Sequence, residues 1–177
     1  MAHLVALLRG INLGSRNRIA MADLRDLLGG MGYEDVRTHL QSGNAVLTTR
    51  QGPDRAARAI EGEIRKRLGL EIDVIVRTGD EIAEIVAANP LGDVATDGSR
   101  HFVVFLSDKP DPAAVRELTG RDFAPERLAA RGRELYAWCP DGVRDSALFK
   151  ALGRQRLAPI STFRNWNTVA KLAEMVG

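Results

Sequence analysis

Residues 35–50, DVRTHLQSGNAVLTTR, are the most informative segment for the architecture of this chain. Val36, Thr38 and Leu40 alternate with polar side chains, and an apolar run, AVLTTR, begins at residue 45. Alternation with a period of two indicates strands, and the small polar residues SGN at 42–44 are typical of a turn. The segment therefore predicts a β-hairpin.

The regions on either side of this hairpin predict one strand and one helix each. Before it, an almost entirely apolar run at 3–9 predicts a covered central strand, and apolar residues at helical spacing over 21–31 predict a helix. After it, Pro53 opens a second amphipathic helix, and IDVIVR at 72–77 returns as a strand. The order strand, helix, strand, strand, helix, strand favours a ferredoxin-like plait.

The second half of the chain repeats this order. FVVFL at 102–106 predicts a strand, Asp111 and Pro112 open a helix, a hairpin surrounds Gly132, and a helix near 146–152 precedes the short strand PISTF and a last helix. An internal match also joins Arg77 to Arg164, 87 positions later, each at the end of a strand and before an amphipathic helix. We therefore expect an α+β fold of duplicated ferredoxin-like (βαββαβ) plait modules, with mainly antiparallel sheets and helices packed on them. The predicted modules are residues 1–90 and 101–177, with a linker at 91–100.

The amino-acid composition indicates a globular protein without a membrane span. The chain has 177 residues, a net charge of +2 and 45% hydrophobic residues, which is typical of a globular protein. No run approaches the roughly 20 apolar residues of a membrane span, so we expect a cytoplasmic protein without a membrane partner. Cys139 is the single cysteine and is interpreted as a small buried apolar residue. No cluster of side chains has metal-ligand spacing, and we expect neither a metal nor a cofactor.

Two loops form the first candidate site, RGINLGSRN at 9–17 and QSGN at 41–44. The first and second strands of a plait run parallel, so these loops are expected at the same edge of the sheet. Three arginines and no acidic residue lie in residues 9–18, where backbone N–H groups and guanidinium groups can hold an anion. The alternative is that glycine and asparagine only build two turns. The candidate ligand-binding residues are Arg9, Gly10, Asn12, Gly14, Arg16, Ser42, Gly43 and Asn44, with Arg9 on the same surface as Ser42 and Asn44 and no carboxylate closing the space between them.

The segment RNWNT at 164–168 is the second candidate site. Arg164 and Trp166 suit a ligand surface, because exposed arginine and tryptophan often anchor binding. The structural alternative is that an asparagine caps the last helix while Trp166, mostly buried, packs on the core. The candidate ligand-binding residues of this segment are Arg164, Asn165, Trp166 and Thr168. His3, His39 and His101 lie far apart in the sequence and are interpreted as structural.

These same segments carry a family resemblance. LLRGINLGSRNRIAMADL, QSGNAVL, NP and STFRNWNTVAKL resemble the domain of unknown function 1697 family, a set of mostly bacterial proteins, over nearly the whole chain. The resemblance implies a duplicated ferredoxin-like architecture and no particular activity. At residue 15 this chain has serine where the family commonly has a second glycine.

The sequence favours an uncharacterised protein that binds an anionic small molecule, and phosphate-bearing compounds are one class of such molecules; the identity of the ligand stays open. Nucleic-acid binding is less favoured, because LVALLR and AVLTTR carry no aromatic residues for base stacking. A homo-oligomerising module without a ligand is the third interpretation, and the oligomeric state stays open. Whether the protein is an enzyme also stays open, since arginine, asparagine and backbone donors can stabilise an oxyanion but no general base accompanies them.

Overall fold

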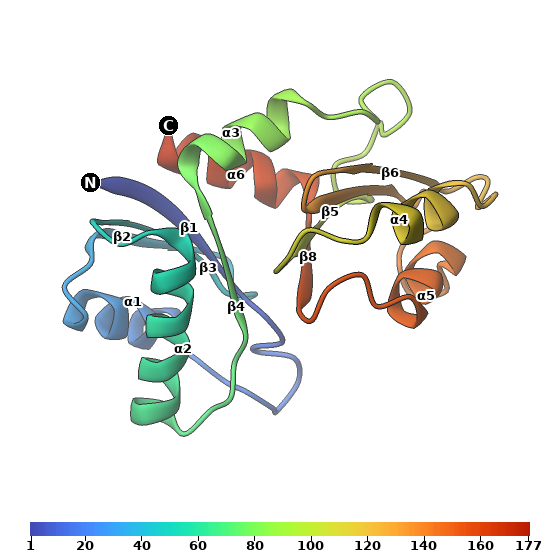
Figure 1. Cartoon of the computed structure of the whole chain (residues 1–177). Helices are drawn as coiled ribbons and strands as arrows, with labels where there is room; N and C mark the ends of the chain where they lie inside the picture. The colour runs from blue at the N-terminus through green and yellow to red at the C-terminus, as the bar shows by residue number, and fades with distance from the viewer. The chain divides into compact units, whose positions relative to one another are not determined.

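The computed structural model describes residues 1–177 and has an α+β fold (Figure 1). It contains two four-stranded sheets, in which all strand pairs are antiparallel, and six helices. The α+β class and the antiparallel sheets expected from the sequence are confirmed. No helix of the structure has the length and apolarity needed to cross a membrane.

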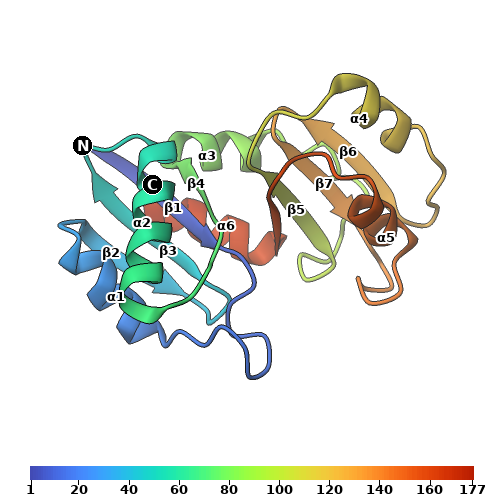
Figure 2. The same ribbon diagram turned by 60° about the horizontal axis from the view of Figure 1, so that its bottom comes forward.

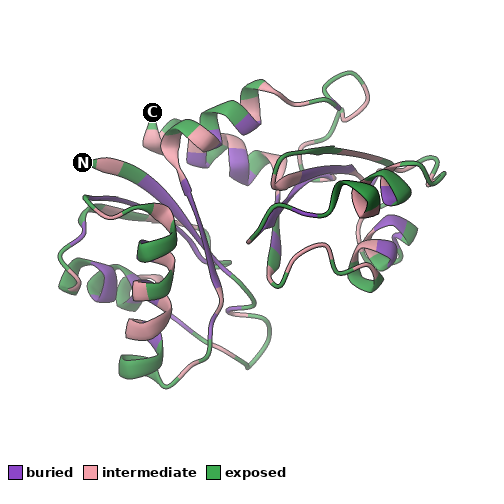
Figure 3. Ribbon diagram, in the orientation of Figure 1, coloured by how far each residue is buried: buried purple, intermediate pink, exposed green.

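The first sheet has the strand order β2-β3-β1-β4. The predicted hairpin is the β2–β3 pair, and β1 lies between β3 and β4 with both of its faces buried from Leu4 to Leu8 (Figure 3). Each predicted strand and helix of this half is present, with bounds that differ by one to three residues at most ends. The elements are β1 (Ala2–Leu8), α1 (Met21–Gly30), β2 (Glu34–His39), β3 (Asn44–Thr49), α2 (Pro53–Leu68), β4 (Val74–Thr78) and α3 (Gly79–Ala87).

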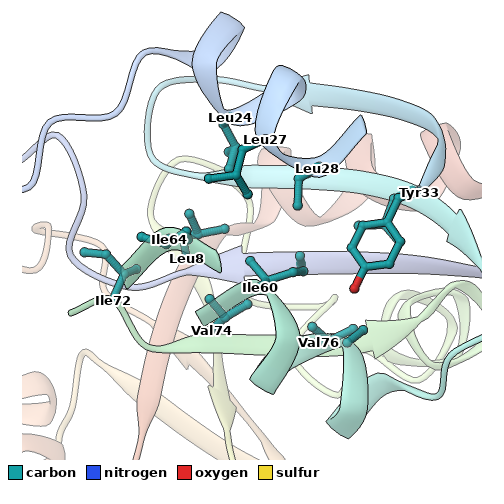
Figure 4. Close-up of a cluster of buried hydrophobic side chains, with 14 of the residues drawn as sticks. Leu8, Leu24, Leu27, Leu28, Tyr33, Ile60, Ile64, Ile72, Val74 and Val76 are labelled. Atoms are coloured by element: carbon teal, nitrogen blue, oxygen red, sulfur yellow. The ribbon is translucent and has the colours of Figure 1, made fainter. Parts of the chain in front are cut away.

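Helices α1 and α2 cover one face of this sheet (Figure 4). Leu24, Leu27 and Leu28 of α1 and Ile60 and Ile64 of α2 are buried against apolar side chains of the sheet. The apolar spacing that predicts these helices also supplies the face they bury. Burial of each such leucine or isoleucine is worth about 1.5–3 kcal/mol.

The second sheet has the order β6-β7-β5-β8, which is the same order as the first when the strands of each half are counted along the chain. Phe102 and Ala137 of the sheet pack with Leu148 of α5, and Phe149 contacts Phe102 edge to face. The elements are β5 (His101–Leu106), α4 (Pro112–Thr119), β6 (Arg127–Arg131), β7 (Glu134–Trp138), α5 (Ala147–Arg154), β8 (Ser161–Asn165) and α6 (Trp166–Val176).

The internal match between Arg77 and Arg164 is visible in the strand register. Arg77 of β4 pairs with Val5, and Arg164 of β8 pairs with Val103. The next residue in each segment caps a helix: the Thr78 hydroxyl accepts a hydrogen bond from the Glu81 N–H at 3.1 Å, while Asn165 accepts one from the Thr168 N–H at 2.9 Å. Each arginine is therefore the last residue but one of its strand and precedes a helix cap.

The division into compact units differs from the predicted modules 1–90 and 101–177. One unit comprises Met1–Glu84 and Lys171–Gly177, and the other comprises Ile85–Ala170. The C-terminal residues belong to the first unit because they contact it: the Arg37 guanidinium donates to the Met175 carbonyl, and Val176 packs beside Gly79. Residues 91–100, predicted as a linker, belong to the second unit.

Candidate functional site

The loop that follows β1 lies beside the β2–β3 turn, as the strand order predicts. The Asn12 side-chain amide donates to the Gln41 carbonyl at 2.7 Å, and the Leu8 N–H donates to the Gly43 carbonyl at 2.9 Å. Figure 2 shows this loop extending beyond the end of β1. The two segments RGINLGSRN and QSGN are thus neighbours in space, although 23 residues separate them in the sequence.

Asn12 determines the shape of this loop. Its side-chain oxygen accepts from the Ile19 N–H at 2.9 Å, and its amide nitrogen donates to the Ile19 carbonyl at 2.9 Å and to the Gln41 carbonyl. The same residue has a positive φ of 53°. Both amide hydrogens of Asn12 are occupied by the protein, so Asn12 positions the loop rather than contacting a ligand itself.

The backbone of the loop alternates between the two signs of φ. Gly10, Asn12 and Gly14 have φ values of 69°, 53° and 65°, whereas Ile11 and Leu13 between them have negative φ. Alternation of this kind turns successive backbone N–H groups toward the same side and forms concavities that bind anions. A Cβ placed on Gly10 or Gly14 would meet no other atom within 4 Å, so the space beside both glycines is open.

The three arginines of residues 9–18 are exposed. The Arg9 guanidinium lies 3.7 Å from the Asp73 carboxylate, with its side chain 56% exposed, so a carboxylate stands near Arg9 on the β4 side of β1. The reason is that Asp73 directly precedes β4, the neighbour of β1, and its carbonyl accepts from the Arg9 N–H at 2.9 Å. An exposed pair at this distance contributes about 0–1 kcal/mol and leaves most guanidinium donors available.

Arg16 and Arg18 complete the basic part of the loop. The Arg18 side chain donates to the Gly14 carbonyl at 3.2 Å, which keeps it over the loop. Arg16 pairs with Leu13 through the backbone only, so its guanidinium extends into solvent. We name residues Arg9–Arg18, with their three guanidinium groups, the arginine loop.

Ser42, Gly43 and Asn44 build the turn on which the arginine loop rests. Asn44 is completely buried, and its amide donates to the His39 carbonyl at 2.9 Å and to the Ser42 hydroxyl at 3.0 Å. Gly43 has a φ of 90° and packs against Leu8 and Ile11 so closely that a Cβ would lie within 3 Å of both side chains. Of these three predicted ligand-binding residues, only Ser42 is exposed.

The second predicted site lies in the second unit, at the junction of β8 and α6. It comprises Arg164, Asn165, Trp166 and Thr168. Arg164 is buried, donates to the Thr162 hydroxyl at 2.7 Å and to the Phe163 carbonyl at 2.8 Å, and burial lowers its pKa to about 10. Asn165 caps the helix through the Thr168 N–H. Trp166 begins α6 and is mostly buried, as predicted, and one face of its ring stacks on His101 with 4.7 Å between the ring centroids.

His101 is a buried residue whose environment the sequence did not reveal. Its side chain is 1% exposed, its Nε2 atom has no hydrogen-bond partner, and desolvation lowers its pKa. An isolated histidine at the start of an apolar strand gives no sequence signal for such burial. Its neutral form is the one that the fold accommodates, which links the stability of the protein to pH.

We expect the free energy of unfolding to fall as the pH drops below about 6.5, because the unfolded chain then binds a proton on His101 more readily than the folded protein does. His101→Phe retains an aromatic ring against Trp166 but cannot be protonated. Urea unfolding between pH 7.5 and pH 5 should show a smaller loss of stability in this variant than in the wild type. Equal losses in the two proteins would contradict the role of His101.

Cys139 has the environment of a core residue, as expected. It is buried beside Ser146, with 3.7 Å between Sγ and Oγ, and burial raises the pKa of its thiol to about 12. The thiolate, which is the nucleophilic form, is therefore scarce at neutral pH. No group of three or more His, Cys, Asp or Glu residues in the chain is arranged to hold a metal ion.

Comparison with known proteins gives a family and a fold. The model of the family described as Protein of unknown function (DUF1697) matches residues 1–136. A search of the curated proteins finds no match. Among solved structures, the conserved bacterial protein SP0830 from Streptococcus pneumoniae is similar with a TM-score of 0.74 and 20% sequence identity, over 99% of this chain and 99% of that chain. At this identity the likeness shows a shared fold.

Proposed function

This chain belongs to the DUF1697 family, and we propose that it binds an anionic small molecule, most favourably a phosphate-bearing one, at the arginine loop. The main support for this proposal is that one loop combines three exposed guanidinium groups with a backbone whose φ angles alternate in sign. Charge and oriented N–H donors are the two features that phosphate sites use.

Rigidity of the loop supports this proposal. The Asn12 side chain ties the loop to Ile19 and to Gln41, and the Asn12 N–H donates to the Asn17 carbonyl at 3.0 Å, so the loop backbone is held in place before a ligand arrives. A preorganised loop binds more tightly because less conformational entropy is lost on binding. The arginine loop contains no carboxylate, histidine or thiol that would serve as a base, so we propose binding rather than a reaction.

The test is isothermal titration with pyrophosphate at low ionic strength. Charge-assisted hydrogen bonds are worth about 1.5–3 kcal/mol each, so Arg9→Ala and Arg16→Ala should each weaken binding by at least about tenfold. Arg58→Ala, an exposed arginine on α2 in the same unit, is the matched control and should bind as the wild type does. Loss of affinity in all three variants would indicate only general charge attraction, and equal affinity in all would refute the site.

We further infer that the two sheets are two copies of one ferredoxin-like plait. The shared strand order, the matching register of Arg77 and Arg164 and the helix caps at Thr78 and Asn165 support this inference. We also infer a cytoplasmic location, because the single cysteine is a reduced core residue and no disulfide is required for the fold.

A further inference from the structure

Two large apolar side chains project from the same end of the first unit. Leu13, in the middle of the arginine loop, is 71% exposed, and Leu40, in the β2–β3 turn, is 56% exposed. The two loops that carry them are joined by the hydrogen bond from Asn12 to the Gln41 carbonyl. Exposure of this size means that the leucines make few contacts with their own unit, so the stability of the fold does not account for them.

Basic side chains share the loop with Leu13. Arg9, Arg16 and Arg18 are exposed on the loop that carries Leu13, and Asp73 beside Arg9 is the one carboxylate paired with them. Apolar tips with cationic neighbours are the pattern by which peripheral proteins contact a membrane surface, where leucine enters the acyl boundary and arginine meets the lipid phosphates.

We propose that the arginine loop, with Leu13 and Leu40, docks on the surface of an anionic phospholipid membrane. This inference rests on the anion site proposed above and identifies the lipid headgroup as the source of its phosphate. The expectation of no membrane partner concerned spanning segments, whereas the two exposed leucines are a feature of the folded surface.

The chemistry of this surface disfavours two other occupants. Single-stranded nucleic acids are held through aromatic side chains that stack on bases, and leucine offers no such stacking. A second copy of the chain docked symmetrically on this surface would bring the three arginines of one protomer toward those of the other. The combination of aliphatic tips and positive charge fits an anionic lipid surface better than either.

Co-sedimentation with vesicles tests the inference. The wild type should sediment with vesicles of phosphatidylcholine and phosphatidylglycerol in equal parts and stay in solution with phosphatidylcholine alone. The double variant Leu13→Ser, Leu40→Ser should lower the partition coefficient by at least about tenfold. Leu68→Ser, which changes an exposed leucine at the end of α2, is the matched control and should leave it unchanged.

A pyrophosphate titration of the same variants separates this inference from the anion site. The double leucine variant should retain pyrophosphate binding, whereas Arg16→Ala should weaken both pyrophosphate and vesicle binding. Pyrophosphate binding by the wild type without vesicle binding would overturn the membrane inference and leave the anion site standing. An unchanged partition coefficient in the double leucine variant would also overturn the membrane inference. It would indicate that vesicles bind through charge alone or through another surface of the protein.

Discussion

Gly43→Ala should lower the free energy of unfolding by about 2–5 kcal/mol. A Cβ at this position would lie 2.8 Å from the Ile11 Cδ1 atom and 2.9 Å from the Leu8 Cβ atom, and the φ of 90° disfavours any side chain. Leu8 and Ile11 are both buried in the core of the first unit, so neither can move away easily. Urea unfolding followed by circular dichroism measures the loss.

Gly14→Ala is the matched control for this prediction. Gly14 also has a positive φ, of 65°, but a Cβ there would meet no atom within 4 Å. Its substitution therefore carries the backbone cost alone, about 1–2 kcal/mol. Equal losses of unfolding free energy in the two variants would mean that close packing of Gly43 on Leu8 and Ile11 is unimportant. The turn would then not support the arginine loop in this way.

Asn12→Ala should lower the free energy of unfolding by about 2–4 kcal/mol and weaken pyrophosphate binding as well. The variant loses the two hydrogen bonds to Ile19 and the one to Gln41, each worth about 0.5–1.5 kcal/mol, and places alanine at a φ of 53°. Because the loop is no longer tied at both points, its N–H donors lose their fixed arrangement. Affinity should fall even though Asn12 itself contacts no ligand.

Asn12→Gly separates the two contributions to this loss. Glycine adopts a positive φ without strain but offers no side chain, so it should recover about 1 kcal/mol relative to alanine and leave binding weak. If Asn12→Ala bound pyrophosphate as well as the wild type, loop rigidity would have no part in the site. If glycine restored full stability, the hydrogen bonds would be dispensable.

Local periodicity made the elements of this fold predictable. The alternation in residues 35–50 and the helical spacing of Leu24, Leu27 and Leu28 reflect which side chains are buried in the same unit. The unit boundaries were less predictable, because the placement of residues 171–177 depends on contacts with residues distant in sequence, such as Arg37 and Gly79. Periodicity within a helix carries no information about which partner it meets.

The candidate site was predictable in position but not in the role of each residue. Strand order brought the two loops together, yet it could not show that Asn12 and Asn44 use their amides within the protein. Asparagine at a turn suits both a ligand contact and a backbone clamp, and only the three-dimensional partners separate the two. For the same reason the exposure of Leu13 and Leu40 was not visible in the sequence, where both resemble ordinary apolar positions.

The most direct test of the anion site is a titration of isotopically labelled protein with pyrophosphate, followed through its backbone amide resonances. The arginine loop and its alternating φ predict that the largest shifts occur at residues 10–17, with little change at Gly69, a glycine of similar φ at the end of α2. Shifts that saturate at residues 10–17 would support binding by the loop backbone. Absence of shifts there, with or without shifts elsewhere, would contradict the proposed function.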